Sequence, residues 1–229
     1  MVKIKYNWLP DFVYAGIDGA ITTFAVVAGV VGANLSTPVI LILGFANLFA
    51  DGFSMAVGKF SSDTAELERM RYLRKIEEKS IKEKPGEERA EIEKILKKFG
   101  FKGKDLIRAK TIVTSNPKVW VNLMMNHELK VIEDNLNPQR GAFITFLAFI
   151  AIGLIPLLGY TFQRHLPFSE NSLFLGTCLS TLFALFLVGT VKSKFSNKFW
   201  LIAGLETSLI GGFAASIAFL IGHILKRLI

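Results

Sequence analysis

Five stretches of the sequence are each about 20 residues long and almost entirely apolar. A helix rises about 1.5 Å per residue, so about 20 mostly apolar residues cross the hydrocarbon layer of a membrane. Each stretch is too long and too uniformly apolar for a strand or for a half-buried helix. The spans are expected at residues 12–33, 37–59, 141–163, 172–191 and 199–225. The sequence therefore predicts an all-α polytopic membrane protein with five transmembrane helices.

Basic residues near these stretches predict the orientation of the chain, because cytoplasmic loops of membrane proteins are enriched in Lys and Arg. Lys3 and Lys5 precede the first span, whereas the link between the third and fourth spans carries only Arg164. Residues 61–140 contain 18 of the 27 Lys and Arg residues. We therefore expect the N-terminus and residues 61–140 to be cytoplasmic, and the membrane to be the plasma membrane if the protein is microbial.

The formal net charge of +8 raises the question of a nucleic-acid partner. The excess bases lie mostly at the ends of the spans and in residues 61–140, which also hold 14 acidic residues. Membrane topology accounts for this charge, so we expect a lipid bilayer and no nucleic acid as partner. No GxGxxG or Walker pattern occurs, and we expect no nucleotide cofactor.

The link between the second and third spans is far longer than a simple connection and should fold as its own helical unit. The sequence thus predicts three parts, at residues 1–60, 61–140 and 141–229. The second helix should run on past the membrane until Pro85 and Gly86 form a turn. Ile92, Ile95, Leu96 and Phe99 then recur at helical spacing, and further helices should begin near Asp105 and after Pro117.

Two of the apolar stretches carry an aspartate well inside the run, namely Asp18 and Asp51. A carboxylate at the centre of a membrane helix costs roughly 2.5 to 3.5 kcal/mol, so such residues usually face a bundle interior and serve a pathway. Asn47 and Met55 lie one helical turn on either side of Asp51 and extend it into a polar stripe. For Asp18 we favour the pathway interpretation; for Asp51 an ion pair, and for Met55 simple packing, remain open.

The long link carries a second group of candidate ligands. Glu88 and Glu91 lie on one helical face, with Glu77 upstream and Met124, Met125 and Glu128 downstream. Carboxylates brought together repel one another and bind divalent cations by relieving that repulsion. Thioethers beside carboxylates suit a first-row transition ion better than Mg²⁺ or Ca²⁺. The alternative interpretation is that each glutamate is a solvated charge beside a lysine and that Met124 belongs to the helical core.

Three segments together resemble the vacuolar iron transporter family. They are residues 18–25 (DGAITTFA), 44–56 (GFANLFADGFSMA) and 124–128 (MMNHE), and the order of two spans, a long insert and three spans is also similar. The resemblance implies a five-span homodimer with its transport path at the subunit interface. It also implies proton-coupled movement of Fe²⁺ out of the cytosol, with Mn²⁺ among the ions that share the route.

The resemblance also assigns roles to individual residues. It implies that Asp18 and Met55 line the membrane path, and that ligands of a cytoplasmic metal-binding domain are Glu88, Glu91, Met124, Met125 and Glu128, with Glu77 as a further candidate. The family usually has a Glu-x-x-Glu pair on the helix extending from the second span. Here Ser80 stands where the second glutamate of that pair is expected, so one carboxylate is missing.

Glu206 lies in the fifth span, between apolar turns, and does not belong to the pattern that the family shows. A buried glutamate in a bundle is a candidate proton carrier, because burial disfavours its charged form. A structural hydrogen bond to another span explains it equally well. We therefore consider Asn47, Asp51 and Glu206 possible residues of the transport path or possible proton carriers.

Two other classes of protein have to be weighed against a transporter. A membrane-bound di-iron oxidase needs Glu-x-x-His on two helices, and no glutamate here has a histidine three residues later. A metal-sensing membrane scaffold would use the spans as an anchor, and an anchor gains nothing from the embedded Asp18. We therefore expect a transporter rather than an enzyme, with divalent metal ions and protons as its cargo and no resident cofactor.

Overall fold

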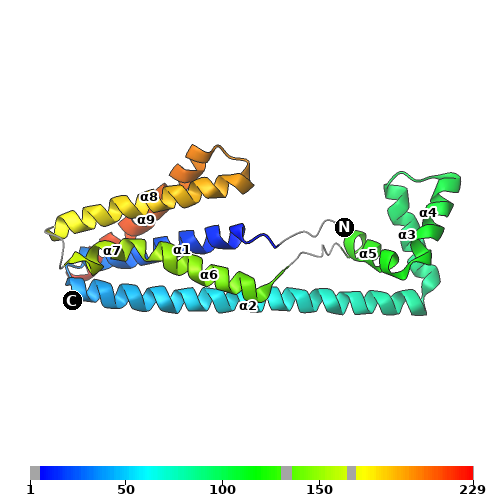
Figure 1. Cartoon of the computed structure of the whole chain (residues 1–229), viewed down its shortest axis with the longest axis horizontal. Coiled ribbons are helices and arrows are strands. Elements are labelled where there is room, and N and C mark those ends of the chain that lie inside the picture. Colours follow the sequence, from blue (N-terminus) through cyan, green and yellow to red (C-terminus); the bar gives the residue numbers. More distant parts are fainter. Residues whose placement is uncertain (1–5, 130–135, 164–168, 229) are drawn as a thin grey trace. The chain divides into compact units, whose positions relative to one another are not determined.

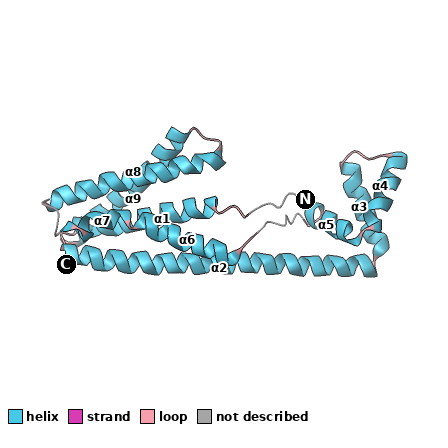
Figure 2. Cartoon of the chain, viewed as in Figure 1, coloured by secondary structure: helices cyan, strands magenta, loops and turns pink. Residues whose placement is uncertain are grey.

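The computed structural model describes residues 6–129, 136–163 and 169–228. Within these ranges the chain forms only helices and no strand (Figures 1 and 2). The helices are α1 (Leu9–Gly32), α2 (Thr37–Glu83), α3 (Pro85–Lys98), α4 (Gly103–Ser115), α5 (Pro117–His127), α6 (Pro138–Gly153), α7 (Ile155–Thr161), α8 (Glu170–Ser196) and α9 (Trp200–Leu225). Lys3, Lys5 and Arg164, on which the predicted orientation depends, lie outside the described residues.

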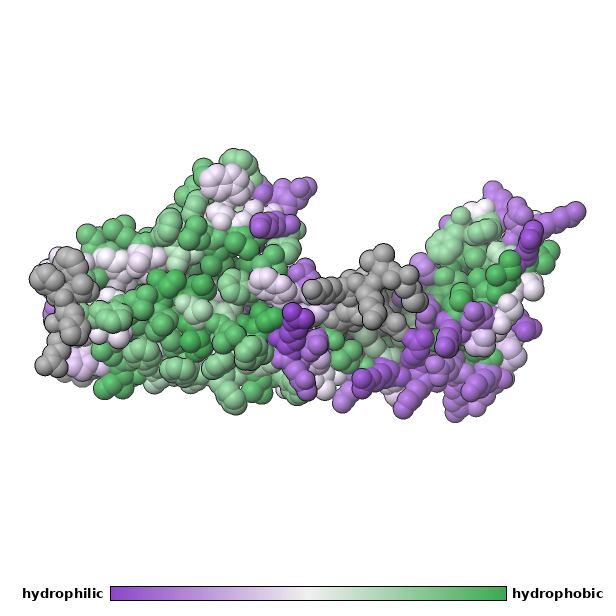
Figure 3. Space-filling view, in the orientation of Figure 1, coloured by the Kyte–Doolittle hydropathy of each residue, from purple (hydrophilic) through white to green (hydrophobic). Residues whose placement is uncertain are grey.

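The chain divides into two compact units, each with its own core. The first, which we call the bundle, comprises Tyr6–Ser61 and Asn137–Ile229, and the second, the insert, comprises Ser62–Leu136. In Figure 3 the side chains of the bundle are mostly hydrophobic and those of the insert mostly hydrophilic. This contrast is expected for membrane-spanning and aqueous parts of one chain.

Four helices, α1, α2, α8 and α9, are long and apolar enough to cross a membrane. A fifth span is obtained if α6 and α7 are counted together, although they are bent by 47°. The sequence predicted a span over residues 141–163 but not the bend within it. Pro156 lies in the first turn of α7, where its ring clashes with the preceding turn and removes a backbone N–H, so the helix breaks at Leu154.

Within the bundle, α1 packs against α6, α7, α8 and α9. Glycines bring the backbones close together: a Cβ added at Gly19 would lie 2.5 Å from the carbonyl oxygen of Phe149 in α6. A Cβ at Gly222 in α9 would clash with the carbonyl oxygen of Gly29 in α1. Small residues are typical of helix contacts in membranes, because there packing rather than water exclusion drives association. The glycines thus fix where α1, and with it Asp18, lies in the bundle.

The second helix continues from Thr37 to Glu83, which confirms the prediction that no break occurs before Pro85. Pro85 does not lie in a turn as predicted, because it is the first residue of α3. Proline is favoured there, since the first N–H of a helix has no partner within that helix and the fixed φ angle suits a helix. The change of direction therefore takes place at Lys84 alone.

The insert contains α3, α4 and α5 packed around Ile92, Leu96, Trp120 and Met124. Gly100 has a φ of +92°, so α3 ends where the sequence predicted. Phe99, predicted to share the buried face, is instead 53% exposed. Its ring meets the edge of the His127 ring at a centroid distance of 4.9 Å. The helical stripe therefore stops contributing to the core one turn earlier than its spacing indicates.

Candidate functional site

Three carboxylates from different parts of the insert converge on one point. Glu77 comes from the last turns of α2, Glu88 from the first turn of α3, and Glu128 directly follows α5. One oxygen atom of each lies within 4.8 Å of the others. Residues separated by up to 51 positions in the chain are thus brought to the spacing that a single cation requires.

Local helix signals produce this convergence. The break at Lys84 starts α3 immediately after α2 and places Glu88 in its first turn. The side chain of Asn116 accepts hydrogen bonds from the backbone N–H groups of Lys118 and Val119, which fixes the start of α5. The core of Ile92, Leu96 and Met124 then holds α3 against α5. The three glutamates are therefore held in place by helices that pack around one core.

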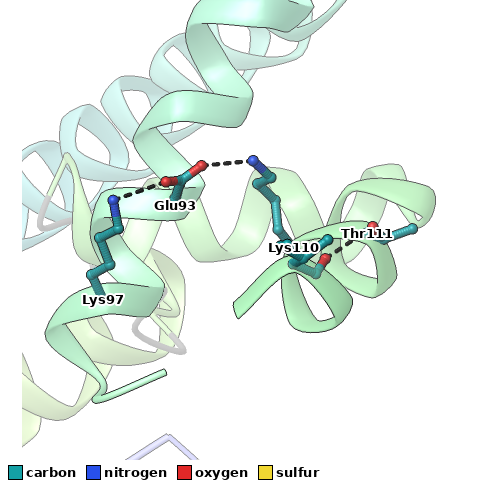
Figure 4. A network of polar contacts seen from close by, with 5 residues as sticks. Glu93, Lys97, Lys110 and Thr111 are labelled. Atoms are coloured by element: carbon teal, nitrogen blue, oxygen red, sulfur yellow. Dashed lines mark hydrogen bonds and ion pairs between the residues drawn. The ribbon is translucent and has the colours of Figure 1, made fainter. Parts of the chain in front are cut away.

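A network of ion pairs connects α3 to α4 within the insert. The carboxylate of Glu93 lies 2.6 Å from the Lys110 ammonium and 2.8 Å from that of Lys97 (Figure 4). Hydrogen bonds from these two lysines lower the pKa of Glu93 to about 2. The charge of Glu93 is thus neutralised by two lysines. Its environment serves as the comparison for the charge environment of the other carboxylates of the insert.

The converging carboxylates have the opposite electrostatics. Glu77 is only 5% exposed, and its Oε1 atom has no hydrogen-bond partner among the described residues. Burial, followed by the nearby charges of Glu88 and Glu128, raises the pKa of Glu77 to about 7. Burial also raises the pKa of Glu88 and that of Glu128. Crowded, desolvated carboxylates are costly when ionised, and a divalent cation placed between them removes the cost.

The remaining predicted ligands of the insert are placed differently. Glu91 acts electrostatically on Glu88 and Glu128, but its own carboxylate pairs with Lys94 at 2.6 Å. Met124 and Met125 are fully buried, in two separate apolar clusters of the insert. The structure therefore brings together Glu77, Glu88 and Glu128 and uses both methionines in its cores. Whether a thioether also turns toward a bound ion stays a prediction.

In the bundle, α1 and α2 present the second group of predicted residues. The charges of Asp18 and Asp51 interact with each other, although the two residues lie on different helices. Asn47, Asp51 and Met55 are all half-buried, whereas Phe49 and Phe53 on the same helix are exposed. The predicted stripe of three residues spaced by four thus lies on one half-buried face of α2. Met55 also packs against the bundle core.

Glu206 differs from its expected environment. Its side chain is 38% exposed, and its carboxylate lies 2.8 Å from the ammonium of Lys198, just before the start of α9. The premise of a glutamate buried among apolar turns was therefore wrong. Lys198 reaches it because α9 begins at Trp200, so that Glu206 lies within two turns of the helix start.

The structure also shows a polar contact that the sequence did not single out. Asp11 in the first turn of α1 pairs with Lys59 of α2 at 3.1 Å and accepts a hydrogen bond from Tyr6. The guanidinium of Arg140 lies 5.9 Å from the centre of the Tyr6 ring. Tyr6 and Lys59 lie near the ends of the first and second apolar stretches. The sequence shows Asp11 at the start of the first apolar stretch and Lys59 at the end of the second. Spacing along the chain cannot show that these two residues, on different helices, form a pair.

Comparisons with known proteins agree on one family. The family model described as the VIT family matches residues 9–223. The vacuolar iron transporter of Plasmodium berghei (strain Anka) is 34% identical over 230 aligned positions, which cover 98% of this chain and 84% of that protein. Vacuolar iron transporter 1 of Arabidopsis thaliana is 30% identical over 220 positions, covering 95% of this chain and 86% of that protein.

Proposed function

The chain belongs to the vacuolar iron transporter (VIT) family, and on that premise we propose that it exports Fe²⁺ from the cytosol across a membrane in exchange for protons. The match confirms the resemblance seen in the sequence. It also makes the chain an integral membrane transporter rather than an enzyme, so a di-iron oxidase is no longer considered. Manganese(II) and other divalent transition ions are proposed as further cargo.

The convergence of Glu77, Glu88 and Glu128 is the observation that carries this proposal. Three carboxylate oxygens within 4.8 Å of one another are an oxygen-donor set for a divalent cation. The insert then captures the ion from the cytosol, with Glu91, Met124 and Met125 as additional proposed ligands. With Ser80 in place of a fourth converging glutamate, the set carries less negative charge than the family pattern, which favours a weaker and more readily released ion.

The bundle provides the proposed route across the membrane. Asp18 interacts electrostatically with Asp51, and Met55 lies on the same face of α2 as Asp51. An ion arriving here exchanges water for carboxylate and thioether ligands. Because a metal ion and a proton compete for the same carboxylate oxygens, a proton taken up by Asp18 from the far side would release the ion. Glu206, paired with Lys198, is a weaker candidate for this exchange.

The proposal also includes an assembly and an orientation. Asp18 and the stripe on α2 are half-buried within one chain, and a second copy of the chain would enclose them in a homodimer. The insert, rich in lysine and arginine, is placed on the cytosolic side by the positive-inside rule.

The decisive experiment measures metal binding to the purified full-length protein by titration calorimetry, with Mn²⁺ as an air-stable probe for Fe²⁺. Glu77→Gln keeps the size of the side chain and removes one of three converging charges, so we expect binding to weaken at least about tenfold. Glu83→Gln is the matched control, because Glu83 is exposed and pairs only with Lys79 among the described residues. Equal affinity of the two variants would contradict the proposal.

A further inference from the structure

Four hydroxyl groups in the interior of the bundle have no hydrogen-bond partner among the described residues. They belong to Thr23 in α1, Tyr160 in α7, and Thr177 and Thr181 in α8. All four residues are buried, and Tyr160 is 4% exposed. An unpaired polar atom in a membrane interior is strongly unfavourable, and buried polar atoms are almost always satisfied by protein or by ordered water. Four such groups in one bundle therefore need a common explanation.

Other threonines of the same bundle show the usual solution. The hydroxyl of Thr22 donates to the carbonyl oxygen of Asp18 at 2.9 Å, and that of Thr207 donates to Ala203 at 2.8 Å. Thr161 bonds in the same way to Leu157. A threonine in a helix can thus satisfy itself within the preceding turn. The buried hydroxyls of Thr23, Thr177 and Thr181 have no such bond within the described residues.

The order of the four residues along the bundle follows from helix contacts and helical rise, and we refer to this order as the line. A Cβ added at Gly159 would lie 3.5 Å from the hydroxyl oxygen of Thr177, and Tyr160 is the next residue of α7. The Thr177 and Tyr160 hydroxyls are near enough to interact, but their geometry falls short of a direct hydrogen bond. Thr181 follows Thr177 by one turn of α8, about 6 Å along the same face.

The packing of α1 on α8 extends the line to Thr23. A Cβ at Gly16 would lie 3.9 Å from Val188, and a Cβ at Gly211 would touch both Leu185 and Ile21. Later residues of α1 thus pair with earlier residues of α8, so the two helices run antiparallel. The same register places Thr23 at the level of Thr181.

At its Tyr160 end, the line meets a pocket of about 330 Å³. The pocket lies where α1 ends and α2 begins, and the start of α8 completes it. Its polar lining consists of Asn34, Thr37, Tyr160, Glu170 and Asn171. This volume is roughly ten times the share of one molecule in liquid water, and the polar groups supply several partners for each water. Tyr160 lines this pocket, and its buried hydroxyl lacks a protein partner within the described residues.

We propose that the line Tyr160, Thr177, Thr181 and Thr23 is a hydrated passage inside a single protomer, open at the polar pocket, through which protons enter the bundle. Water molecules bridge hydroxyls that are too far apart for a direct hydrogen bond. Each water or hydroxyl accepts a proton on one side as it releases one on the other, so charge moves without net chemical change. The passage lies along α7 and α8, separately from the polar stripe of α2.

The role of the passage in transport rests on the proposed proton exchange, whereas its hydration does not. Along α1, Thr23 lies five residues beyond Asp18, which corresponds to about 7.5 Å. A passage reaching Thr23 therefore delivers protons to the helix that carries the proposed membrane carboxylate. Separate paths for metal and proton would let both cross one protein without passing the same narrow point.

Hydration can be tested with cysteine labelling in proteoliposomes, because Cys178 is the only cysteine of the chain and can be replaced by alanine. Thr177→Cys and Thr181→Cys, each in the full-length Cys178→Ala protein, are exposed to Ag⁺, a small thiol-reactive cation. We expect both to react at least tenfold faster than Leu179→Cys, whose side chain points to the apolar surface with 63% exposure. Rates no faster than that of Leu179→Cys would overturn the proposal.

A second measurement needs no substitution and covers the case in which a variant fails to fold. Hydroxyl-radical footprinting of the unmodified protein should oxidise Tyr160, because radicals form from the water beside it. Phe149 is also fully buried but lies in the apolar core, and it serves as the unreactive reference. Equal protection of the two rings would overturn the hydrated passage.

Proton conduction is tested with Thr181→Val, which keeps the shape and removes the hydroxyl. We expect metal transport driven by a pH gradient to fall at least fivefold, while Mn²⁺ binding to the insert stays within twofold. Normal transport by Thr181→Val would overturn the conducting role. If the wild-type protein ignored the pH gradient, the proposed proton exchange would fail with it, whereas Ag⁺ labelling would still decide whether the passage holds water.

Discussion

The insert and the bundle handle their charged groups in opposite ways. In the insert, Glu77, Glu88 and Glu128 crowd together, and the charges of Lys84 and Lys94 do not offset their burial and mutual repulsion, so ionising them has an electrostatic cost that a cation would relieve. In the bundle, carboxylates are few, and the backbones are locked by glycine contacts around α1. Under the proposed function, this difference would correspond to two tasks: charge-driven capture of the ion by the insert, and its passage through the bundle.

The largest expected effect tests whether the ionised carboxylates of the insert lower its stability. Because the pKa of Glu77 is raised from 4.5 to about 7, its contribution to stability is fully present below pH 4.5 and is lost as the pH rises through 7. The metal-free insert should therefore be less stable at pH 8 than at pH 5, by at most about 3 kcal/mol. Hydrogen exchange of α3 and α5, corrected for the intrinsic pH dependence, measures this change.

Saturating Mn²⁺ should remove the pH difference, because the ion replaces the protons as the neutralising charge. Glu77→Gln provides the control, since position 77 can no longer ionise, and its difference in protection between the two pH values should be smaller than that of the wild type. Greater stability of the metal-free wild type at pH 8 would mean that the crowded carboxylates carry no such cost, and the contrast with the bundle would disappear.

The next effect tests the glycine frame of the bundle. Gly222→Ala places a methyl group against the Gly29 carbonyl oxygen, so α9 has to move away from α1. We expect a loss of about 1 to 3 kcal/mol in bundle stability, typical of overpacking, seen as a lower unfolding temperature in detergent. Gly176→Ala in α8 is the matched control, because nothing lies within 4 Å of the added Cβ; an equal loss there would show that the close contact is not the cause.

A smaller effect is expected on the pH dependence of metal binding by the insert. When the pH falls from 8 to 6, it passes the pKa of about 7 for Glu77, so protons occupy a site that the metal needs. Mn²⁺ affinity should fall about tenfold, which is close to the full effect of one competing proton per site. Calorimetry at both pH values measures this ratio, and Glu77→Gln should show a flatter profile. An unchanged wild-type affinity would place the binding site elsewhere.

The smallest effect is expected where the insert has already neutralised its charge. Lys110→Ala removes one of the two cations that hold Glu93, but the other, Lys97, remains. Exposed ion pairs contribute little, so the unfolding temperature should change by less than about 2 °C and Mn²⁺ affinity should not change. A larger loss of affinity would indicate that the Figure 4 network positions the carboxylates rather than merely joining α3 to α4.

Sequence alone predicted the parts of the fold that follow from local chemistry. Long apolar runs give helices wherever no proline interrupts them, and Asn116, Pro117 and Gly100 mark helix ends through their own backbone preferences. The bend at Pro156 was not predicted, because the length and composition of an apolar run do not show a break within it.

The site was predictable only in part. Candidate ligands could be named because carboxylates and thioethers are unusual in these patterns, but spacing could not show which of them meet. Glu91 and Glu88 lie on one helical face, yet Lys94 pairs with Glu91 while Glu88 joins Glu77. The pairing of Glu206 with Lys198 and the row of unpaired hydroxyls also depend on contacts between residues that only the fold brings together.

The most direct test of the division between capture and passage is Fe²⁺ uptake into proteoliposomes containing Asp18→Asn, measured together with metal binding on the same preparation. The account predicts that uptake under a pH gradient falls to the rate of protein-free liposomes, while the insert binds Mn²⁺ as tightly as in the wild type. Asp105→Asn, an exposed aspartate of α4, should leave both unchanged. Uptake by Asp18→Asn at the wild-type rate would contradict the account.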